Sequence, residues 1–231
     1  MRACLLQGQE LKANSELVLS DEAFHHLVQV CRLREKDELL VLNGLGQTAK
    51  ATVQTIHKRQ MILRLLELTV VNPPPKRDAL FVIPKKDALE AMLKMSVELG
   101  LRKVFLVRGA YSQERLPEEK RLSSLLQSAI EQSNNPWPPE IVLLKDWSEV
   151  NWNEYQHVLC FDPVGERADK LSFAKTDGIL TLIGPEGGFS PEEQLMVKQL
   201  PNGKLIAWDT PILRAPTALS MAVGWVTARM A

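Results

Sequence analysis

The 231 residues suffice for one large domain or two small ones, each with a substantial core. A hydrophobic fraction of 45% and a charged fraction of 24% are ordinary for a globular protein and exclude a disordered chain. The formal net charge is zero, so whole-molecule charge does not indicate a nucleic-acid partner. Residues 76–121, however, carry 11 Lys and Arg against 7 Asp and Glu, whereas residues 122–231 carry 8 against 13. The basic excess is therefore local, and it mildly indicates an anion-facing surface.

The cysteines and the apolar runs bear on the compartment. Cys4, Cys31 and Cys160 are odd in number and lack metal-ligand spacing, so reduced thiols and no metal site are expected. No apolar signal segment is visible at the start of the chain. The longest nearly apolar run, residues 218–228, is too short to span a bilayer. We expect a soluble cytoplasmic protein with no membrane partner.

Residues 1–72 are predicted to form a small β-rich domain. Strands are expected over residues 38–42, 49–56 and 61–71. Asn43-Gly44-Leu45-Gly46 is a strong turn signal between the first two. Residues 21–30 have the pattern of a short helix with Ser20 or Asp21 as its cap. Several short strands with one helix predict a small barrel.

A proline run divides the chain. Pro73, Pro74 and Pro75 cannot continue a helix or a central strand, so we place the domain boundary there, between domains at residues 1–72 and 77–231. Beyond it, strands are predicted over residues 79–83, 104–107, 141–144, 158–161, 179–183 and 204–207. Helices are predicted over residues 87–99, started by a capping pair of Asp87 and Glu90, over 117–133, and over 216–230. This alternation predicts an α/β domain with a largely parallel sheet covered on both faces.

The last predicted helix, residues 216–230, is apolar nearly all round. Such a helix must be buried on most sides, within its own domain or against another subunit. A two-fold interface is therefore one hypothesis for this segment.

The most informative run is residues 179–193. An apolar strand leads into Gly184-Pro185-Glu186-Gly187-Gly188, and a helix begins with Ser190 as cap, Pro191 in its first turn and Glu193 closing a capping box. The loop lacks the Lys-Ser or Lys-Thr of a phosphate-binding loop and the glycine spacing of a dinucleotide site. A tight turn between buried elements and a ligand-binding loop are both consistent with this pattern alone.

Two segments read together resemble the RsmE-type ribosomal RNA methyltransferases of the SPOUT superfamily. They are residues 182–190, Leu-Ile-Gly-Pro-Glu-Gly-Gly-Phe-Ser, and Ile212-Leu213-Arg214 followed by Thr217-Ala218. Residues 26–33, beginning at His26 and including Arg32, resemble the family's N-terminal motif, and further landmarks are Lys85, residues 98–100 and residues 131–132. The chain departs from the family pattern at residues 208–211, at Pro216 and at residues 134–135.

The resemblance implies a PUA-like β-barrel for RNA, a trefoil-knot α/β domain that dimerises, and S-adenosylmethionine as donor, with S-adenosylhomocysteine as product. The substrate implied is N3 of a uridine in 16S small-subunit ribosomal RNA, free or in the 30S particle. Cofactor contacts are expected from Phe161, Ile183, Gly184, Glu186, Gly187, Gly188, Trp208, Ile212, Leu213 and Thr217. RNA contacts are expected from His26, Arg32, Lys85 and Lys86.

Methylation at N3 requires loss of a proton, so a base or strong stabilisation of the developing anion is needed. The sequence offers no clear base, and Arg214 is the candidate catalytic residue, orienting the uridine and stabilising its carbonyl oxygens. Trp208 and Glu186 also have purely structural interpretations, as a core side chain and as a loop-stabilising acid. Two alternative functions remain: an RNA-binding protein without turnover, and a knotted enzyme that methylates ribose 2′-oxygen.

Overall fold

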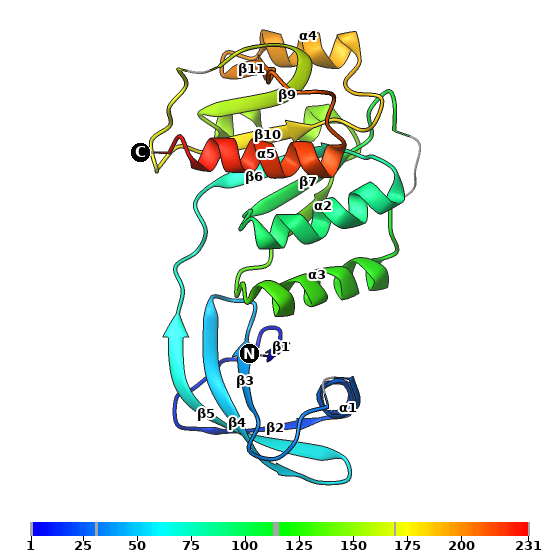
Figure 1. Ribbon diagram of the computed structural model, residues 1–231. Coiled ribbons are helices and arrows are strands. Elements are labelled where there is room, and N and C mark those ends of the chain that lie inside the picture. The colour runs from blue at the N-terminus through cyan, green and yellow to red at the C-terminus, as the bar shows by residue number, and fades with distance from the viewer. Residues whose placement is uncertain (1, 31, 113–115, 169, 231) are drawn as a thin grey trace. The chain divides into compact units, whose positions relative to one another are not determined.

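The computed structural model describes residues 2–30, 32–112, 116–168 and 170–230. The chain divides into two compact units (Figure 1). The first consists of Met1–Pro73 together with Leu126–Pro138, and the second of Pro74–Leu125 together with Pro139–Ala231. The proline run thus lies between the units, but a later segment returns to the first unit.

The first unit is built on a five-stranded sheet in the order β1-β3-β4-β5-β2. Its elements are β1 (Arg2–Leu5), β2 (Glu16–Ser20), α1 (Asp21–His25), a π-helix (His26–Val30), β3 (Glu38–Leu42), β4 (Gln47–Ile56) and β5 (Gln60–Val70). Only the β1–β3 pair is parallel; the other pairs in this sheet are antiparallel. Period-two alternation of buried side chains along β3, β4 and β5 forms the core of this unit, which includes Leu39, Val53 and Leu63.

The turn between β3 and β4 needs glycine at two positions and contacts the later segment, residues 126–138, of the first unit. Gly44 and Gly46 have φ of +70° and +86°, in the left-handed region that favours glycine. A Cβ atom on Gly46 would lie 2.3 Å from the Trp137 ring. The Trp137 indole N–H donates to the Val71 carbonyl at 3.0 Å, and the Gly46 N–H donates to the Pro136 carbonyl at 3.1 Å. Residues 126–138 are therefore an integral part of the first unit.

The second unit contains a six-stranded sheet in the order β11-β9-β10-β6-β7-β8, and every pair in it is parallel. The strands are β6 (Arg77–Val82), β7 (Lys103–Val107), β8 (Glu140–Leu143), β9 (His157–Glu166), β10 (Ile179–Ile183) and β11 (Gly203–Ile206). Its helices are α2 (Lys86–Glu98), α4 (Pro191–Gln199) and α5 (Ala215–Thr227), and two short 3-10 turns cover Trp147–Glu149 and Trp152–Glu154. The helix α3 (Glu119–Ser133) begins in this unit and belongs to the first unit from Leu126 onward. The predicted α/β class with a parallel sheet is confirmed.

Alternation along the central strands separates two cores. Phe81, Ile183 and their neighbours on one face pack with α2 and α5, which lie side by side (Figure 1). Leu80, Leu182 and their neighbours on the other face pack with Val197 of α4 and with Tyr155. Because both faces are covered, the central strands are mostly apolar, and all five residues of β10 are buried, as expected for residues 179–183.

The predicted start of α2 is wrong. Its N-cap is Lys85, which makes no side-chain capping bond within the described residues, and Asp87 already lies inside the helix. Glu90 binds Arg121 through two hydrogen bonds of 3.1 and 2.6 Å instead of closing a capping box. The helix ends as predicted, at Gly100 with φ of +65°.

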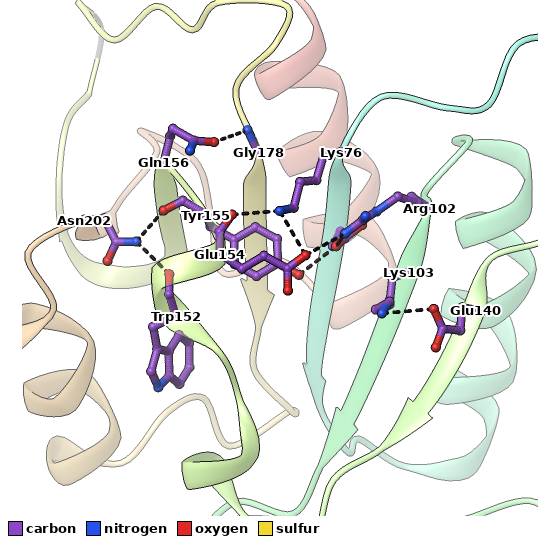
Figure 2. Close-up of polar contacts among 11 residues, drawn as sticks. Lys76, Arg102, Lys103, Glu140, Trp152, Glu154, Tyr155, Gln156, Gly178 and Asn202 are labelled. Carbon is purple, nitrogen blue, oxygen red and sulfur yellow. Dashed lines mark hydrogen bonds and ion pairs between the residues drawn. The ribbon is translucent and has the colours of Figure 1, made fainter.

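A charged cluster joins the amino ends of the parallel strands. Figure 2 shows Lys76, Arg102 and Glu154 converging there. Asp78, which is fully buried in β6, accepts hydrogen bonds from Arg102 Nε at 3.0 Å, from Arg102 Nη2, and from the Tyr155 hydroxyl at 2.7 Å. The Asp78 carboxylate raises the pKa of Arg102, and burial, followed by Asp78, raises the pKa of Tyr155. The cluster therefore stabilises the amino ends of the strands, on the side of the sheet away from their carboxyl ends.

None of the helices within the described residues combines the length and apolar character needed to cross a membrane.

Candidate functional site

A pocket of about 450 Å³ opens at the carboxyl ends of β9, β10 and β11. It is lined by residues 183–189 from the glycine-rich loop and by residues 206–208, 210–213, 215 and 218 from the segment that follows β11, with residues 161–164 and Gln194 completing the wall. The two motifs, about 25 residues apart, therefore meet in one hollow. The carboxyl edge of a parallel sheet is where α/β proteins bind ligands.

The glycine-rich loop is fixed by the helix that follows it. Ser190 accepts a hydrogen bond from the Glu193 N–H at 3.2 Å, and the Glu193 carboxylate accepts one from the Ser190 N–H at 2.8 Å. This is the predicted capping box, with Pro191 in the first turn. Glu193 also accepts a hydrogen bond from the Ala110 N–H at 3.0 Å, which ties the loop to the segment after β7.

Two glycines of this loop lie where a Cβ atom would cause strain or crowding. Gly188 has φ of +72°, which strains any residue with a Cβ atom. A Cβ atom on Gly187 would lie 3.0 Å from the Cβ of Tyr111. The loop can thus bring its backbone close to a ligand in the pocket.

The wall opposite the loop is apolar. Trp208 stacks on Phe161 with ring centroids 4.5 Å apart. Ile212 is 88% exposed at the pocket, an unusual state for a large aliphatic side chain, and Leu213 beside it is half-buried. Ile183, at the end of β10, is almost fully buried beneath the pocket. Such a wall suits a flat apolar group.

Two carboxylates also line the pocket. Asp162 is only 7% exposed and accepts a hydrogen bond from the Val164 N–H at 3.0 Å, with Gln194 Nε2 3.4 Å from its other oxygen. Glu186 is exposed and accepts a hydrogen bond from the Lys85 N–H at 3.3 Å. That bond brings Lys85 next to the glycine-rich loop and agrees with the loop-stabilising interpretation of Glu186.

The sequence had given no role to Asp162 and Gln194. Asp162 follows the predicted strand 158–161 and precedes Pro163, a pattern that reads as a turn. In the structure β9 continues to Glu166 and pairs with β11 at that residue. The feature of the sequence that could have identified Asp162 as a site residue is a carboxylate near the carboxyl end of a buried parallel strand.

Other expected site residues lie away from this pocket or in the first unit. Arg214 and Thr217 are exposed and are not among the described pocket-lining residues, although their neighbours Leu213 and Ala215 are. Lys86 is exposed at the first residue of α2. In the first unit, His26 begins the π-helix with its Nε2 3.6 Å from the Glu131 carboxylate, and exposed Arg32 has φ of +53°. Short π-helices occur often at functional sites.

No group of three or more potential metal ligands occurs among the described residues.

Comparison with protein families gives two matches that together span most of the chain. The RNA methyltransferase domain matches residues 72–227, and the RNA methyltransferase PUA domain matches residues 19–66. The matches correspond in order to the predicted α/β and β-rich domains.

Relatives and solved structures agree with this result. The chain is 29% identical to ribosomal RNA small subunit methyltransferase E of Rickettsia conorii, over 95% of this chain and 92% of the relative. It is 24% identical to the protein of the same name from Bacillus subtilis, over 92% and 90%. A structure of ribosomal RNA small subunit methyltransferase E from Neisseria gonorrhoeae, bound to S-adenosyl methionine, has a TM-score of 0.86 at 22% identity and covers 100% of this chain and 98% of its own.

A further structure, the methyltransferase Lpg2936 of Legionella pneumophila with bound cofactor SAM, has a TM-score of 0.82 at 24% identity, over 98% and 96% of the two chains. These likenesses confirm the predicted fold class, a SPOUT-type α/β domain preceded by a PUA domain. Since the domain match covers well over half of the residues, the chain belongs to the RNA methyltransferase family.

Proposed function

We propose that this protein transfers a methyl group from S-adenosylmethionine to N3 of a uridine in 16S ribosomal RNA, in the cytoplasm. The observation that carries the proposal is the single pocket formed by the glycine-rich loop and residues 210–213. Support comes from family membership and from relatives named for small-subunit ribosomal RNA methylation. The similar structure from Neisseria gonorrhoeae, which is bound to S-adenosyl methionine, supports the choice of donor.

The residues of the pocket fit this cofactor. Three glycines of the loop line the pocket without side chains that would keep an adenosine away from the backbone, and Phe161, Trp208 and Leu213 supply apolar surface for the purine. The indole N–H of Trp208 is buried and has no hydrogen-bond partner among the described residues. A ligand with a hydrogen-bond acceptor close to this N–H would supply the missing partner.

Bound S-adenosylmethionine supplies the activated methyl group, so the protein needs chiefly to bind, orient and exclude water. Asp162 is the buried carboxylate of the pocket, and its charge favours the positively charged portion of the donor. Ile212 is highly exposed at the pocket and adds apolar surface beside the bound S-adenosylmethionine. Gln194 holds the second oxygen of Asp162 in place.

The residues near the pocket also suit the RNA. Arg214 follows Leu213 directly, and its exposed side chain is free to reach a uridine carbonyl and stabilise negative charge there. Lys85 and Lys86 stand at the start of α2, beside the glycine-rich loop, where phosphate contacts would position the strand. His26 and Arg32 are the proposed RNA contacts of the PUA domain.

A homodimer through the α/β domain is part of this proposal. The exposed Ile212 and the half-buried Met221 and Trp225 of α5 are apolar side chains of the kind that a second subunit covers. Light scattering after size exclusion measures the assembly, and a monomeric mass at micromolar concentration would contradict this part.

The proposal is tested by methyl transfer to small-subunit particles that lack the modification, followed by nucleoside mass analysis. We expect 3-methyluridine, formed only with S-adenosylmethionine present. A 2′-O-methylated nucleoside would identify the ribose-methylating alternative. RNA binding without any affinity for S-adenosylmethionine, measured by calorimetry, would identify a protein without turnover.

A further inference from the structure

A second hollow of about 740 Å³ lies along the edge of the same sheet. It is formed by residues 164–168, 170 and 171, which end β9 and follow it, by Lys198 in the last turn of α4, and by residues 203–206 of β11. β11 is the edge strand of the six-stranded sheet. The hollow, here called the edge groove, lies wholly within the second unit.

The edge groove gathers positive charge from a segment that is otherwise acidic. Residues 122–231 contain only 8 Lys and Arg against 13 Asp and Glu, yet four of those eight cations line the groove: Arg167, Lys170, Lys198 and Lys204. Among the described lining residues, Glu166 is the single acid. If these cations were placed without regard to a ligand, they would be spread over the surface of the whole segment instead of half of them lining one groove.

Most of this positive charge is available to a ligand. Arg167 pairs with Asp209 at 2.5 Å, but both side chains are largely exposed. Lys170, Lys198 and Lys204 are exposed and form no ion pair with any described residue. A polyanion would therefore displace only solvent and counterions from these three lysines.

The edge groove adjoins the pocket at the carboxyl ends of the strands. Val164 and Ile206 line both hollows, so a chain that leaves the pocket between them enters the groove directly. A base must leave its stack to reach a methyl donor in the pocket, and the nucleotides next to it are then unpaired. Their phosphates require positive charge within a few nucleotides of the pocket.

We propose that the edge groove binds the phosphate backbone of the single-stranded RNA that flanks the target nucleotide. The inference deepens the proposed function and rests on it, because an RNA substrate is what brings phosphates to this side of the pocket. Lys198 and Lys204 act as positioning residues that hold the strand without contacting the reacting atoms.

The test uses the full chain and fluorescein-labelled oligouridylate, with binding measured by anisotropy over a range of salt concentrations. In the groove variant Lys198→Gln/Lys204→Gln, we expect the slope of log K against log salt to fall by about 1.4, since each lost single-strand contact accounts for about 0.7. At 0.1 M salt this corresponds to about 25-fold weaker binding. Lys198→Arg/Lys204→Arg keeps the charge and should restore both quantities.

The matched control is Lys145→Gln/Lys175→Gln, which removes the same charge from two exposed lysines of the second unit outside the edge groove. It should leave the slope unchanged. An unchanged slope in the groove variant, an equal loss in the control, or no RNA binding by the wild type would each overturn the proposal.

Methyl-transfer kinetics and the affinity for S-adenosylmethionine distinguish a failure of this inference from a failure of the proposed function. In methyl transfer, the groove variant should raise the KM for RNA and leave kcat and the affinity for S-adenosylmethionine unchanged. If the wild type binds RNA through the groove but neither binds S-adenosylmethionine nor transfers a methyl group, the proposed function fails and the groove assignment stands.

Discussion

Replacing Asp78 with Asn should destabilise the second unit strongly. The carboxylate is fully buried and accepts three hydrogen bonds, two from Arg102 and one from the Tyr155 hydroxyl. An Asn offers one acceptor oxygen, and its amide group would face the donors of Arg102, which would keep only Glu154, at 3.5 Å, as a carboxylate partner. Breaking a fully buried ion pair costs about 3–5 kcal/mol, and this variant should lie near the lower end because the Arg102 side chain is 34% exposed and keeps its contact with Glu154. At about 3 kcal/mol the midpoint of thermal unfolding should fall by about 6–12 °C for a unit of this size, at about 2–4 °C per kcal/mol.

The assay is urea unfolding followed by tryptophan fluorescence. Four of the five tryptophans lie in the second unit, so this signal reports mainly on that unit: Trp147, Trp152, Trp208 and Trp225. Because Asp78 lies at the amino ends of the strands, the folded fraction of the variant should keep its affinity for S-adenosylmethionine. A large loss of affinity without loss of stability would refute the structural role.

The chain offers a matched control for the same experiment. Arg121 and Glu90 form a pair with two hydrogen bonds of similar geometry, but 54% of the Arg121 side chain is exposed. Arg121→Gln should therefore cost much less than Asp78→Asn, because solvent screens an exposed ion pair. Tyr155→Phe removes one hydrogen bond to a charged group and should cost about 1.5–3 kcal/mol. Equal effects of Asp78→Asn and Arg121→Gln would show that burial of the pair does not govern its contribution.

Three further predictions concern the pocket and its surroundings. Gly188→Ala should cost about 1–2 kcal/mol of stability because φ is +72°, and calorimetry should show weaker donor binding; unchanged affinity would exclude a role of the loop backbone. Arg214→Gln should lower kcat for methyl transfer by at least about 10-fold without changing donor affinity, as expected for a group that acts only on developing charge. Burial raises the pKa of the Cys160 thiol, so in a Cys4→Ser/Cys31→Ser background the remaining thiol should react with a disulfide reagent only on unfolding. In the same background stability should decline as pH rises past the ordinary thiol pKa, because the unfolded chain ionises first; rapid reaction of the native protein or a flat alkaline profile would contradict this.

Local signals accounted for the parts of the fold that the sequence predicted well. The capping box of Ser190 and Glu193 and the helix stop at Gly100 depend on backbone groups within a few residues, and the structure confirms both. The strand 179–183 was also predicted correctly, because a strand covered on both faces leaves a run of mostly apolar, β-prone residues.

Tertiary contacts account for what the sequence did not reveal. Glu90 had the spacing of a capping residue relative to Asp87, but it pairs with Arg121, which lies 31 positions along the chain. Asp162 lies within β9, at the register shift between the β11 partners Cys160 and Glu166, although Asp-Pro reads locally as a turn. The assignment of Arg214 to chemistry remains a prediction, since its exposed side chain acquires a role only beside an RNA that the sequence does not specify.

The first unit is formed from two separate parts of the chain, and this affects how it folds during synthesis on the ribosome. On the ribosome, the strands of residues 2–70 emerge long before Trp137, the side chain that packs on Gly46 and binds the Val71 carbonyl. Glu131, which accepts the Leu5 N–H at 3.1 Å, likewise arrives late. The first unit therefore stays incompletely closed until residues 126–138 have left the exit tunnel, and by then β6 and β7, two of the six strands of the parallel sheet, are already outside.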